Sequence, residues 1–389
     1  MKTLTSSWAS EKVRDFDGSG GHRIGTSGDI RSGDWLIKEA SMKGIHVEKM
    51  PVALDRMIIE EAYVECAQRR IEALPMFDAP ATPASGISGS FSLNGEGAAV
   101  GYAEFPPNAA SIKGQPLELL RSTTTHSALV VATLSPSGAL CPINAQYFSA
   151  PFGPPVLQVA GMQGEFLKAQ ASQKTPVKVF SAIRREHTQS FNVEAHTAAI
   201  ASAKPLVIAT PRTGWWESTA ERAGGLLAWL AAVGMAGKMQ NGNSLRRQVL
   251  AYATCGHELG HIGLDELLRQ RKDLVPDASC WLHLGANLGT ASNLQMMIRA
   301  ENPDDGHLMR DLLIEEAYPA DFVAVEPIAK ISGEGHDLVK QGAKVLSMAG
   351  ANRYFHDASD RWPGNINAAG IASISRAVAR WVALQAGKS

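Results

Sequence analysis

A regular alternation of buried strands and helices in the second half of the chain is the feature that most constrains the fold. Three apolar runs predict strands at 204–210 (KPLVIAT), 246–255 (RRQVLAYATC) and 278–289 (ASCWLHLGANLG, a strand followed by glycines). Helical patterns follow the first two, at 221–237 and 258–271. Alternation of this kind builds a mostly parallel sheet with helices on both faces. We therefore predict an α/β fold with a central, mostly parallel sheet flanked by helices.

A change of composition near residue 78 marks a second structural region. The stretch FDAPATPASGISGSFSLNGEG is rich in Pro, Gly, Ser and Ala, which is typical of a boundary. Short apolar runs separated by turn residues follow it, such as HSALVVATL and PVLQVAGM. We predict a β-rich insert domain at 81–184, within an α/β domain formed by 1–80 and 185–389.

The segment ahead of the insert carries three local patterns. Residues 29–43 predict an amphipathic helix that ends at Gly44. The run IHVEKMPV alternates like a strand, and residues 55–72 predict a second helix or a mixture of helix and strand.

Charge and cysteine content exclude several classes of protein. The formal net charge is −1 and no run of basic residues occurs, so we expect no nucleic-acid or membrane partner. The four cysteines include no CxxC pair, which favours a reducing compartment. The N-terminus lacks an apolar signal core, and the run GLLAWLAAV is too short to span a bilayer. We expect a soluble cytoplasmic protein, and we leave open its assembly into a homo-oligomer.

The stretch His257-Glu258-Leu259-Gly260-His261 matches the zincin signature, in which two histidines one helical turn apart bind zinc. That motif requires one continuous helix, because residues i and i+4 then share a face. Here the motif directly follows a predicted buried strand and Gly256, and glycines at 260 and 263 weaken a helix by about 1 kcal/mol each. We therefore disfavour the zincin interpretation and expect His261 to be a packed or hydrogen-bonded histidine.

Residues whose side chains could bind a ligand or take part in catalysis stand at the ends of the three predicted strands. They are Thr210–Arg212, Cys255–Glu258 and His283–Gly285. In open α/β sheets, functional groups collect where the strands end, so we expect these segments to converge. A nucleophile pair of Cys255 with His257 is one open alternative, although a thiol that ends a buried strand is more often structural.

Several segments, taken in order, resemble the co-catalytic zinc aminopeptidase family, which includes leucyl aminopeptidases and glutamate carboxypeptidase-like proteins. The resemblance covers nearly the whole chain. It rests on HRIGTSGDIRSGDWLIKEASMKGIHVE, SFNVEAHTA, RQVLAYATCGHELGHIG and YFHDASDRW. The insert is similar in position to the protease-associated insert of that family. The resemblance implies an aminopeptidase-like fold and a hydrolase active on C–N bonds.

The family's site holds two zinc ions, and the resemblance locates its residues here one by one. Two positions keep their type, the glutamate ligand at Glu258 and the last histidine at His356. The others are replaced: the first histidine by Thr210, the acid two residues later by Arg212, the bridging aspartate by Arg222 (with Glu221 one residue away), the general base by His257 and the further aspartate by His283.

These replacements change the expected chemistry. Arginine is always protonated and cannot bridge two cations, so a dinuclear site is not expected. A single divalent metal, most naturally zinc, has competent ligands in Glu258, His283 and His356. His257 would then act as the catalytic general base or stabilise charge, with Arg222 assisting. A metal-free use of the same residues stays open.

The stretch TPRTGWWESTAERAGG predicts a substrate-binding region. Arg212 and Arg222 suit a substrate carboxylate or phosphate, while Trp215 and Trp216 would line the pocket. Glu217 would receive a substrate amine, and Glu221 belongs to the same predicted binding region. A dinuclear zinc site would form only if Glu221 or Glu217 supplied the bridging anion. In the alternative interpretation, the tryptophans pack the insert against the main domain and the arginines pair with local acids.

Two functional hypotheses follow. In the first, the chain is a divergent aminopeptidase-like hydrolase that cleaves a peptide or small amide, covered by its insert and limited to small-molecule or short-peptide substrates. In the second, it is a non-catalytic binding or assembly protein on a peptidase scaffold that has lost its ligands.

Overall fold

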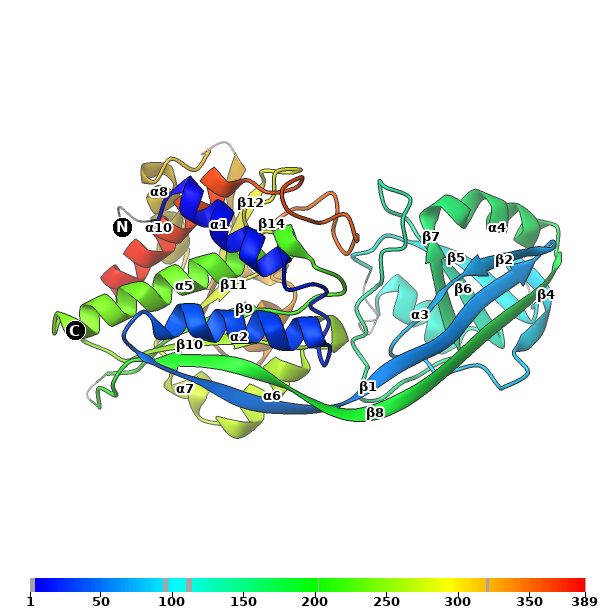
Figure 1. The fold of residues 1–389 in the computed structure, drawn as a ribbon, viewed down its shortest axis with the longest axis horizontal. Helices are drawn as coiled ribbons and strands as arrows, with labels where there is room; N and C mark the ends of the chain where they lie inside the picture. Colours follow the sequence, from blue (N-terminus) through cyan, green and yellow to red (C-terminus); the bar gives the residue numbers. More distant parts are fainter. Residues whose placement is uncertain (1–3, 94–96, 110–113, 202, 320–321, 389) are drawn as a thin grey trace.

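The computed structural model describes residues 4–388 except 94–96, 110–113, 202 and 320–321. The molecule is elongated and has two lobes (Figure 1). The larger lobe holds a sheet with helices on both faces and both chain termini, and the smaller lobe holds the insert. Two very long strands run from one lobe into the other and join them.

The helices alternate with strands along most of the chain. Their bounds are α1 Ser6–Asp17, α2 Ser27–Ser41, α3 Pro116–Thr123, α4 Gly164–Ser172, α5 Thr219–Asn241, α6 Ile262–Gln270, α7 Leu274–Asp277, α8 Pro303–Glu315, α9 Glu334–Lys340 and α10 Ala368–Ala386.

The strands form one continuous hydrogen-bonded sheet. Their bounds are β1 His46–Cys66, β2 Arg69–Glu72, β3 Leu74–Pro75, β4 Ile87–Leu93, β5 Val100–Phe105, β6 Ala128–Thr133, β7 Val156–Ala160, β8 Pro176–His196, β9 Leu206–Pro211, β10 Val249–Thr254, β11 Cys280–Leu284, β12 Met296–Ala300, β13 Val323–Pro327 and β14 Val345–Gly350. The spatial order is β13-β12-β14-β11-β9-β10-β8-β4-β5-β6-β7-β3, with β1 paired to β8.

The centre of the main-lobe sheet is parallel, as the sequence predicts. Strand β9 pairs in parallel with both β10 and β11, and β11 pairs in parallel with β14. Antiparallel pairs flank this centre, β10 with β8 on one side and β14 with β12 on the other. The carboxyl ends of β9, β10 and β11 therefore meet at one edge of the sheet.

Two apolar layers cover the main-lobe sheet. On one face, α5 and α10 pack together and α1, α2 and α8 complete a large core around Trp229 and Trp381. On the other face, α6, α7 and α9 bury a smaller core around Tyr252 and Trp281. Gly224 lets α5 approach the sheet edge closely, because a Cβ there would lie 1.3 Å from the Leu288 carbonyl oxygen.

The sequence interpretation of residues 55–72 is wrong in part, because no helix forms there. Strand β1 continues to Cys66, and β2 covers Arg69–Glu72. Along this part of β1 both faces are partly exposed, and its pairing with β8 shifts between Ile59 and Glu61. A strand exposed on both faces shows no clean alternation, which explains why its pattern was ambiguous.

The insert is rich in strands, and it also contains helices. Strands β4, β5, β6 and β7 pair in parallel, and α3 and α4 pack beside them. Because β8 begins at Pro176 and continues to His196, it crosses the predicted boundary at 184/185 without a break. The predicted boundaries stay predictions. In the described part of the chain, no helix combines the length and apolarity needed to cross a membrane.

Candidate functional site

The segment after β10 turns sharply before the next helix starts. Gly256 adopts a left-handed conformation (φ 73°), His257–Leu259 form one 3₁₀ turn, and α6 begins only at Ile262. His261 itself is left-handed at φ 63°. His257 and His261 therefore do not share a helix, and the zincin interpretation fails, as expected. Burial raises the pKa of the Cys255 thiol to about 12, which disfavours it as a nucleophile.

Glu258 is completely buried and is held on both carboxylate oxygens. The backbone N–H of Ile24 donates to Oε1 (2.7 Å), and the Thr213 hydroxyl donates to Oε2 (2.7 Å). Thr213 also accepts from the Gly256 N–H at 2.7 Å, so it ties the β9 end to the β10 end. Burial raises the pKa of Glu258, and these hydrogen bonds oppose that shift. In this structure these two hydrogen bonds fix the position of the Glu258 side chain.

His257 forms a dyad with a residue that sequence reasoning did not identify. Its Nδ1 lies 3.2 Å from Oε1 of Glu334, at the start of α9. The other oxygen of Glu334 accepts from the Thr254 hydroxyl at 2.7 Å. A carboxylate accepts only, so Nδ1 carries the proton and the Nε2 lone pair is free. Burial, followed by the charge of Arg222, holds the pKa of His257 well below its usual value, which leaves the imidazole neutral.

Arg222 and Glu221 lie side by side in the first turn of α5. The Arg222 Nε donates to the Thr213 carbonyl (2.6 Å), and its Nη2 lies 2.6 Å from Oε1 of Glu221. The same Glu221 oxygen lies 3.8 Å from Nε2 of His356. Glu221, rather than Arg222, therefore faces the last histidine, which refines the one-residue ambiguity in the sequence assignment.

Several buried polar atoms at these strand ends lack a partner. Within the described residues, Nε2 of His283 and of His356 makes no hydrogen bond, and apart from their mutual ion pair the Glu221 oxygens and the terminal nitrogens of Arg222 make none either. Burial lowers the pKa of His283 to about 4 and also lowers that of His356. The nearby charge of Arg222 lowers the pKa of both histidines further. Unsatisfied buried groups are costly, so their concentration here indicates a site for water or a polar ligand.

Arg212 does not join this group, although it follows β9 directly. Its guanidinium is buried beneath α2, and its side chain is 2% exposed. All three of its nitrogens have partners, namely the Phe191 carbonyl, the Asp29 carbonyl and carboxylate, and the Ser190 hydroxyl. The substrate-binding role predicted for Arg212 stays a prediction, but its donors are already engaged inside the protein. We therefore assign it a structural role.

The two tryptophans have different surroundings. Trp215 is 4% exposed, donates to the Asn144 side chain (2.9 Å) and contacts the Phe77 ring, so it packs the insert against the main lobe. Trp216 donates to the carbonyl of His356 at 3.0 Å and stays partly exposed. Glu217 lies 3.3 Å from Arg361 in an ion pair. Trp215 matches the packing alternative, whereas Trp216 and Glu217 border the last histidine turn.

A segment of the insert closes over the strand ends. The Pro142 carbonyl accepts from Nδ1 of His356 (2.7 Å), and the Ala145 N–H donates to the Glu258 carbonyl (2.9 Å). The Ser137 hydroxyl also contacts the Asp357 carboxylate. His257 is the most exposed of the converging residues, at 8%, so a ligand would reach it first.

Asp360, four residues after His356, contacts the start of helix α5. It accepts from the Glu221 N–H at the start of α5 (3.0 Å) and from Asn365 (2.7 Å), so it caps that helix. Burial raises the pKa of Asp360 to about 7. The histidine is oriented by Pro142 instead of by either neighbouring aspartate.

The residues at the strand ends fit a divalent ion poorly. Among the described residues, Glu258, His283 and His356 do not form a compact group of ligand atoms. A cation bound by Glu221 and His356 would lie beside the Arg222 guanidinium, which is ion-paired to that same carboxylate. The predicted single zinc ion therefore stays a prediction that elemental analysis must test, and no chemical step below depends on it.

The fold that holds the strand-end site is similar to that of solved peptidases. No family model matches the sequence, and no curated protein matches it. Solved structures match over almost the whole chain. A peptidase M28 precursor from Shewanella amazonensis SB2B is 15% identical with a TM-score of 0.77, covering 100% of this chain and 95% of its own.

Two further structures are aminopeptidases. BSAP, a zinc aminopeptidase from Bacillus subtilis, is 12% identical with a TM-score of 0.74, covering 99% of this chain and 96% of its own. An aminopeptidase from Aneurinibacillus sp. strain AM-1 is 12% identical with a TM-score of 0.70, covering 99% and 94%. At such low identity the likeness establishes the aminopeptidase-like fold.

Proposed function

We propose that this chain is a hydrolase of C–N bonds in short peptides or small amides that uses an imidazole base in place of a metal pair. The observation that carries the proposal is the His257–Glu334 dyad at the carboxyl end of β10, close enough to the Arg222 guanidinium, itself ion-paired with Glu221, for that charge to lower the pKa of His257. A base oriented by a carboxylate and a cation near the reacting centre are the parts that amide hydrolysis requires.

The chemistry follows from the protonation state of the dyad. Nε2 of His257 removes a proton from water as the water oxygen attacks the amide carbon. The carbonyl oxygen becomes an oxyanion, which the Arg222 guanidinium stabilises. The imidazolium then returns the proton to the amine nitrogen as the C–N bond breaks, giving an acid and an amine. Glu334 holds the tautomer and stabilises the transient imidazolium.

Substrate size and charge follow from the lining of the site. The insert segment is hydrogen-bonded to His356 and to the Glu258 backbone, so it lies over the strand ends, and this cover supports small substrates. The Glu221 carboxylate, which is ion-paired with Arg222, would suit a substrate amine, and the Arg222 guanidinium would suit a carboxylate or the oxyanion.

The direct test is turnover of a panel of aminoacyl anilides, aminoacyl amides and N-acyl amino acids, followed by amine release. We expect His257→Gln to lower kcat by about 10²- to 10⁴-fold. Glu334→Gln should lower it less and change the pH profile. The control is His261→Gln, which alters a neighbouring ring paired with Asp337 (2.6 Å) and should cost less than tenfold.

Chelator treatment and elemental analysis decide the role of metal. Activity that survives metal removal supports the imidazole mechanism, whereas activity that returns only with zinc refutes it. The non-catalytic hypothesis is favoured by one observation, the Glu221–Arg222 ion pair that already neutralises the site. Saturable binding of an amide without turnover by the wild-type chain would establish that alternative.

A further inference from the structure

A second group of histidines lies on the opposite edge of the same sheet, away from the strand-end site. It consists of His46 and Glu48 near the start of β1 and His196 at the end of β8. In the described residues it is the one group of at least three potential metal ligands whose ligand atoms all lie within 4.8 Å of one another. We propose that these three residues bind a zinc ion.

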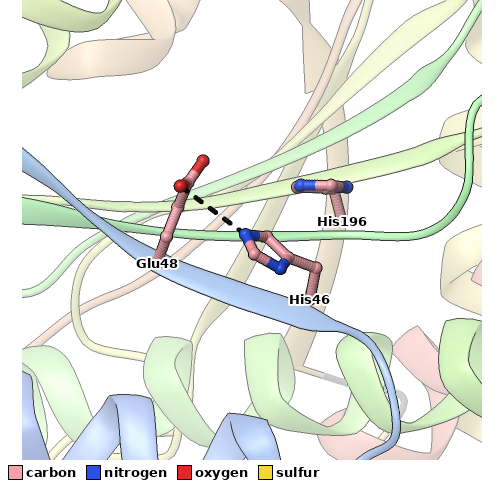
Figure 2. A group of neighbouring side chains, drawn as sticks. All are labelled: His46, Glu48 and His196. Carbon is pink, nitrogen blue, oxygen red and sulfur yellow. Dashed lines mark ion pairs between the residues drawn. The ribbon is translucent and has the colours of Figure 1, made fainter.

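The pairing of the strands brings the three residues together. His46 and His196 are direct cross-strand partners in the antiparallel β1–β8 pair. Glu48 is two residues from His46, so it projects from the same face of the strand. Figure 2 shows the His46 ring between the Glu48 carboxylate and the His196 ring. Nε2 of His46 already lies 3.5 Å from Oε2 of Glu48, and the two rings are 4.7 Å apart between centroids.

The distances suit zinc after a small side-chain adjustment. Zinc–ligand distances of roughly 2.0–2.2 Å place two ligands of a tetrahedral ion roughly 3.3–3.5 Å apart. The His46–Glu48 pair has that spacing, and the remaining atoms, which lie within 4.8 Å of one another, must close by about 1.5 Å at most. The His46 and Glu48 side chains are 57% and 48% exposed, so neighbouring atoms do not prevent the movement.

Ring orientation supplies an independent argument. Nδ1 of His196 lies 3.2 Å from the Thr197 carbonyl, which can only accept, so Nδ1 donates and the Nε2 lone pair is free. Metal-bound histidines characteristically donate their second nitrogen to such an acceptor. Within the described residues, Glu48 forms no ion pair with a lysine or arginine, so its negative charge remains available.

The three ligands predict a zinc site with one open coordination position, and we call this group of His46, Glu48 and His196 the zinc clamp. Two imidazoles and one carboxylate leave a fourth position for water, which favours zinc over magnesium. The ion would tie the start of β1 to the end of β8. Because His196 pairs with Leu250 and β10 ends at Thr254, the clamp and the strand-end site are roughly 13 Å apart along β10.

The test is titration of the untagged full chain, stripped of metal, with zinc chloride in a calorimeter. We expect one saturable zinc site that magnesium does not fill, and a zinc-dependent rise in melting temperature. His46→Ala and His196→Ala should each weaken zinc binding at least tenfold and abolish that rise. The matched control is His187→Ala, which removes an exposed histidine of β8 that pairs with Asp55 alone (3.0 Å).

Cobalt gives a second readout, since its visible absorption reports a four-coordinate site with histidine ligands. The result that would overturn the proposal is a titration unchanged in the His46→Ala/His196→Ala double variant, or no saturable binding by the wild-type chain, which would leave an ordinary surface ion pair. A zinc isotherm lost instead in His356→Ala would assign the ion to the strand-end site. Far-UV circular dichroism checks that each variant folds.

Discussion

The two histidine groups lie at opposite edges of one sheet and differ in the charge that accompanies them. At the carboxyl ends of the strands, His257, His283 and His356 surround the guanidinium of Arg222 and are buried. At the other edge, His46 is exposed, His196 is partly exposed, and the carboxylate of Glu48 lies beside His46. Both groups offer imidazole nitrogens. Among the described residues, only the second brings its ligand atoms within 4.8 Å of one another and combines them with a carboxylate that forms no ion pair with lysine or arginine.

The comparison teaches that ligand type alone does not predict a metal site. An imidazole is a neutral ligand, so the net charge of the site depends on the groups that share it. A fixed cation among the histidines opposes a divalent ion by direct repulsion, whereas a free carboxylate attracts one. The strand-end site, which the family resemblance marks as a metal centre, is therefore the less suitable of the two.

The largest effect is expected from Arg222→Leu. Loss of the guanidinium leaves the fully buried Glu221 without its counter-charge, and breaking such a pair costs about 3–5 kcal/mol of unfolding free energy. Denaturant unfolding measures the loss, and a second change, Glu221→Gln, should recover much of it. Arg184→Leu, which breaks an exposed pair with Glu186, is the control. A change no larger than that of the control would show that Arg222 does not stabilise the site.

The next effect concerns acid stability. The folded-state pKa of His283 is about 4 and its ordinary value is 6.5, so the unfolded chain binds the proton more readily. Above pH 6.5 the neutral His283 makes its full contribution to the free energy of unfolding. This contribution is lost as the pH falls towards 4, and the total loss is about 3 kcal/mol. His283→Leu should make the unfolding free energy less dependent on pH in this window. Urea unfolding at pH 7 and 4.5 tests this, with His46→Gln as control, and an unchanged dependence contradicts it.

The smallest effect is expected from changing the charge of Glu48 in the exposed histidine group. Glu48→Gln removes the anion and should weaken zinc binding about tenfold. Glu48→Lys brings a cation to the histidines, as Arg222 does at the other edge, and should weaken zinc binding about 100-fold or more. Calorimetry separates the two variants. Equal affinities would show that the accompanying charge does not control metal binding here.

The fold was predictable where strands are buried on both faces. Strands β9, β10 and β11 are continuous apolar runs, and all their residues except Cys280 are buried. The long ribbon of β1 and β8 was harder to predict, because its middle part lies between the core of the main lobe and the core of the insert and is packed in neither. Its residues between the lobes alternate irregularly, so the sequence around Ile59 fits helix and strand equally well.

Part of the candidate site was also predictable. Because parallel strands end at one edge, the sequence indicated that His257 and His283 converge, and the family resemblance added Arg222 and His356. It did not indicate side-chain direction: Arg212 points beneath α2, and Glu221 faces His356 although the family resemblance favoured Arg222. Adjacent helical residues differ by about 100° around the axis, so a shift of one residue changes which side chain enters the site.

Two other features had only weak signals in the sequence. Glu334 follows no predicted strand, and the surrounding SGEGHD stretch reads as a turn. The zinc clamp joins residues 150 positions apart. It could have been found only by pairing the HVE of the predicted first strand with the EAH of the strand at 190–198.

The unbroken β1–β8 ribbon has a consequence for how this protein can change through evolution. Each strand contributes to the cores of both lobes, so the spacing of core-facing side chains in one lobe fixes that in the other. Insertion of one residue into either strand would turn the following side chains to the opposite face. We therefore expect an exchange of this insert to succeed only where the side-chain register of both strands is kept, or is restored by a bulge such as the one between Ile59 and Glu61.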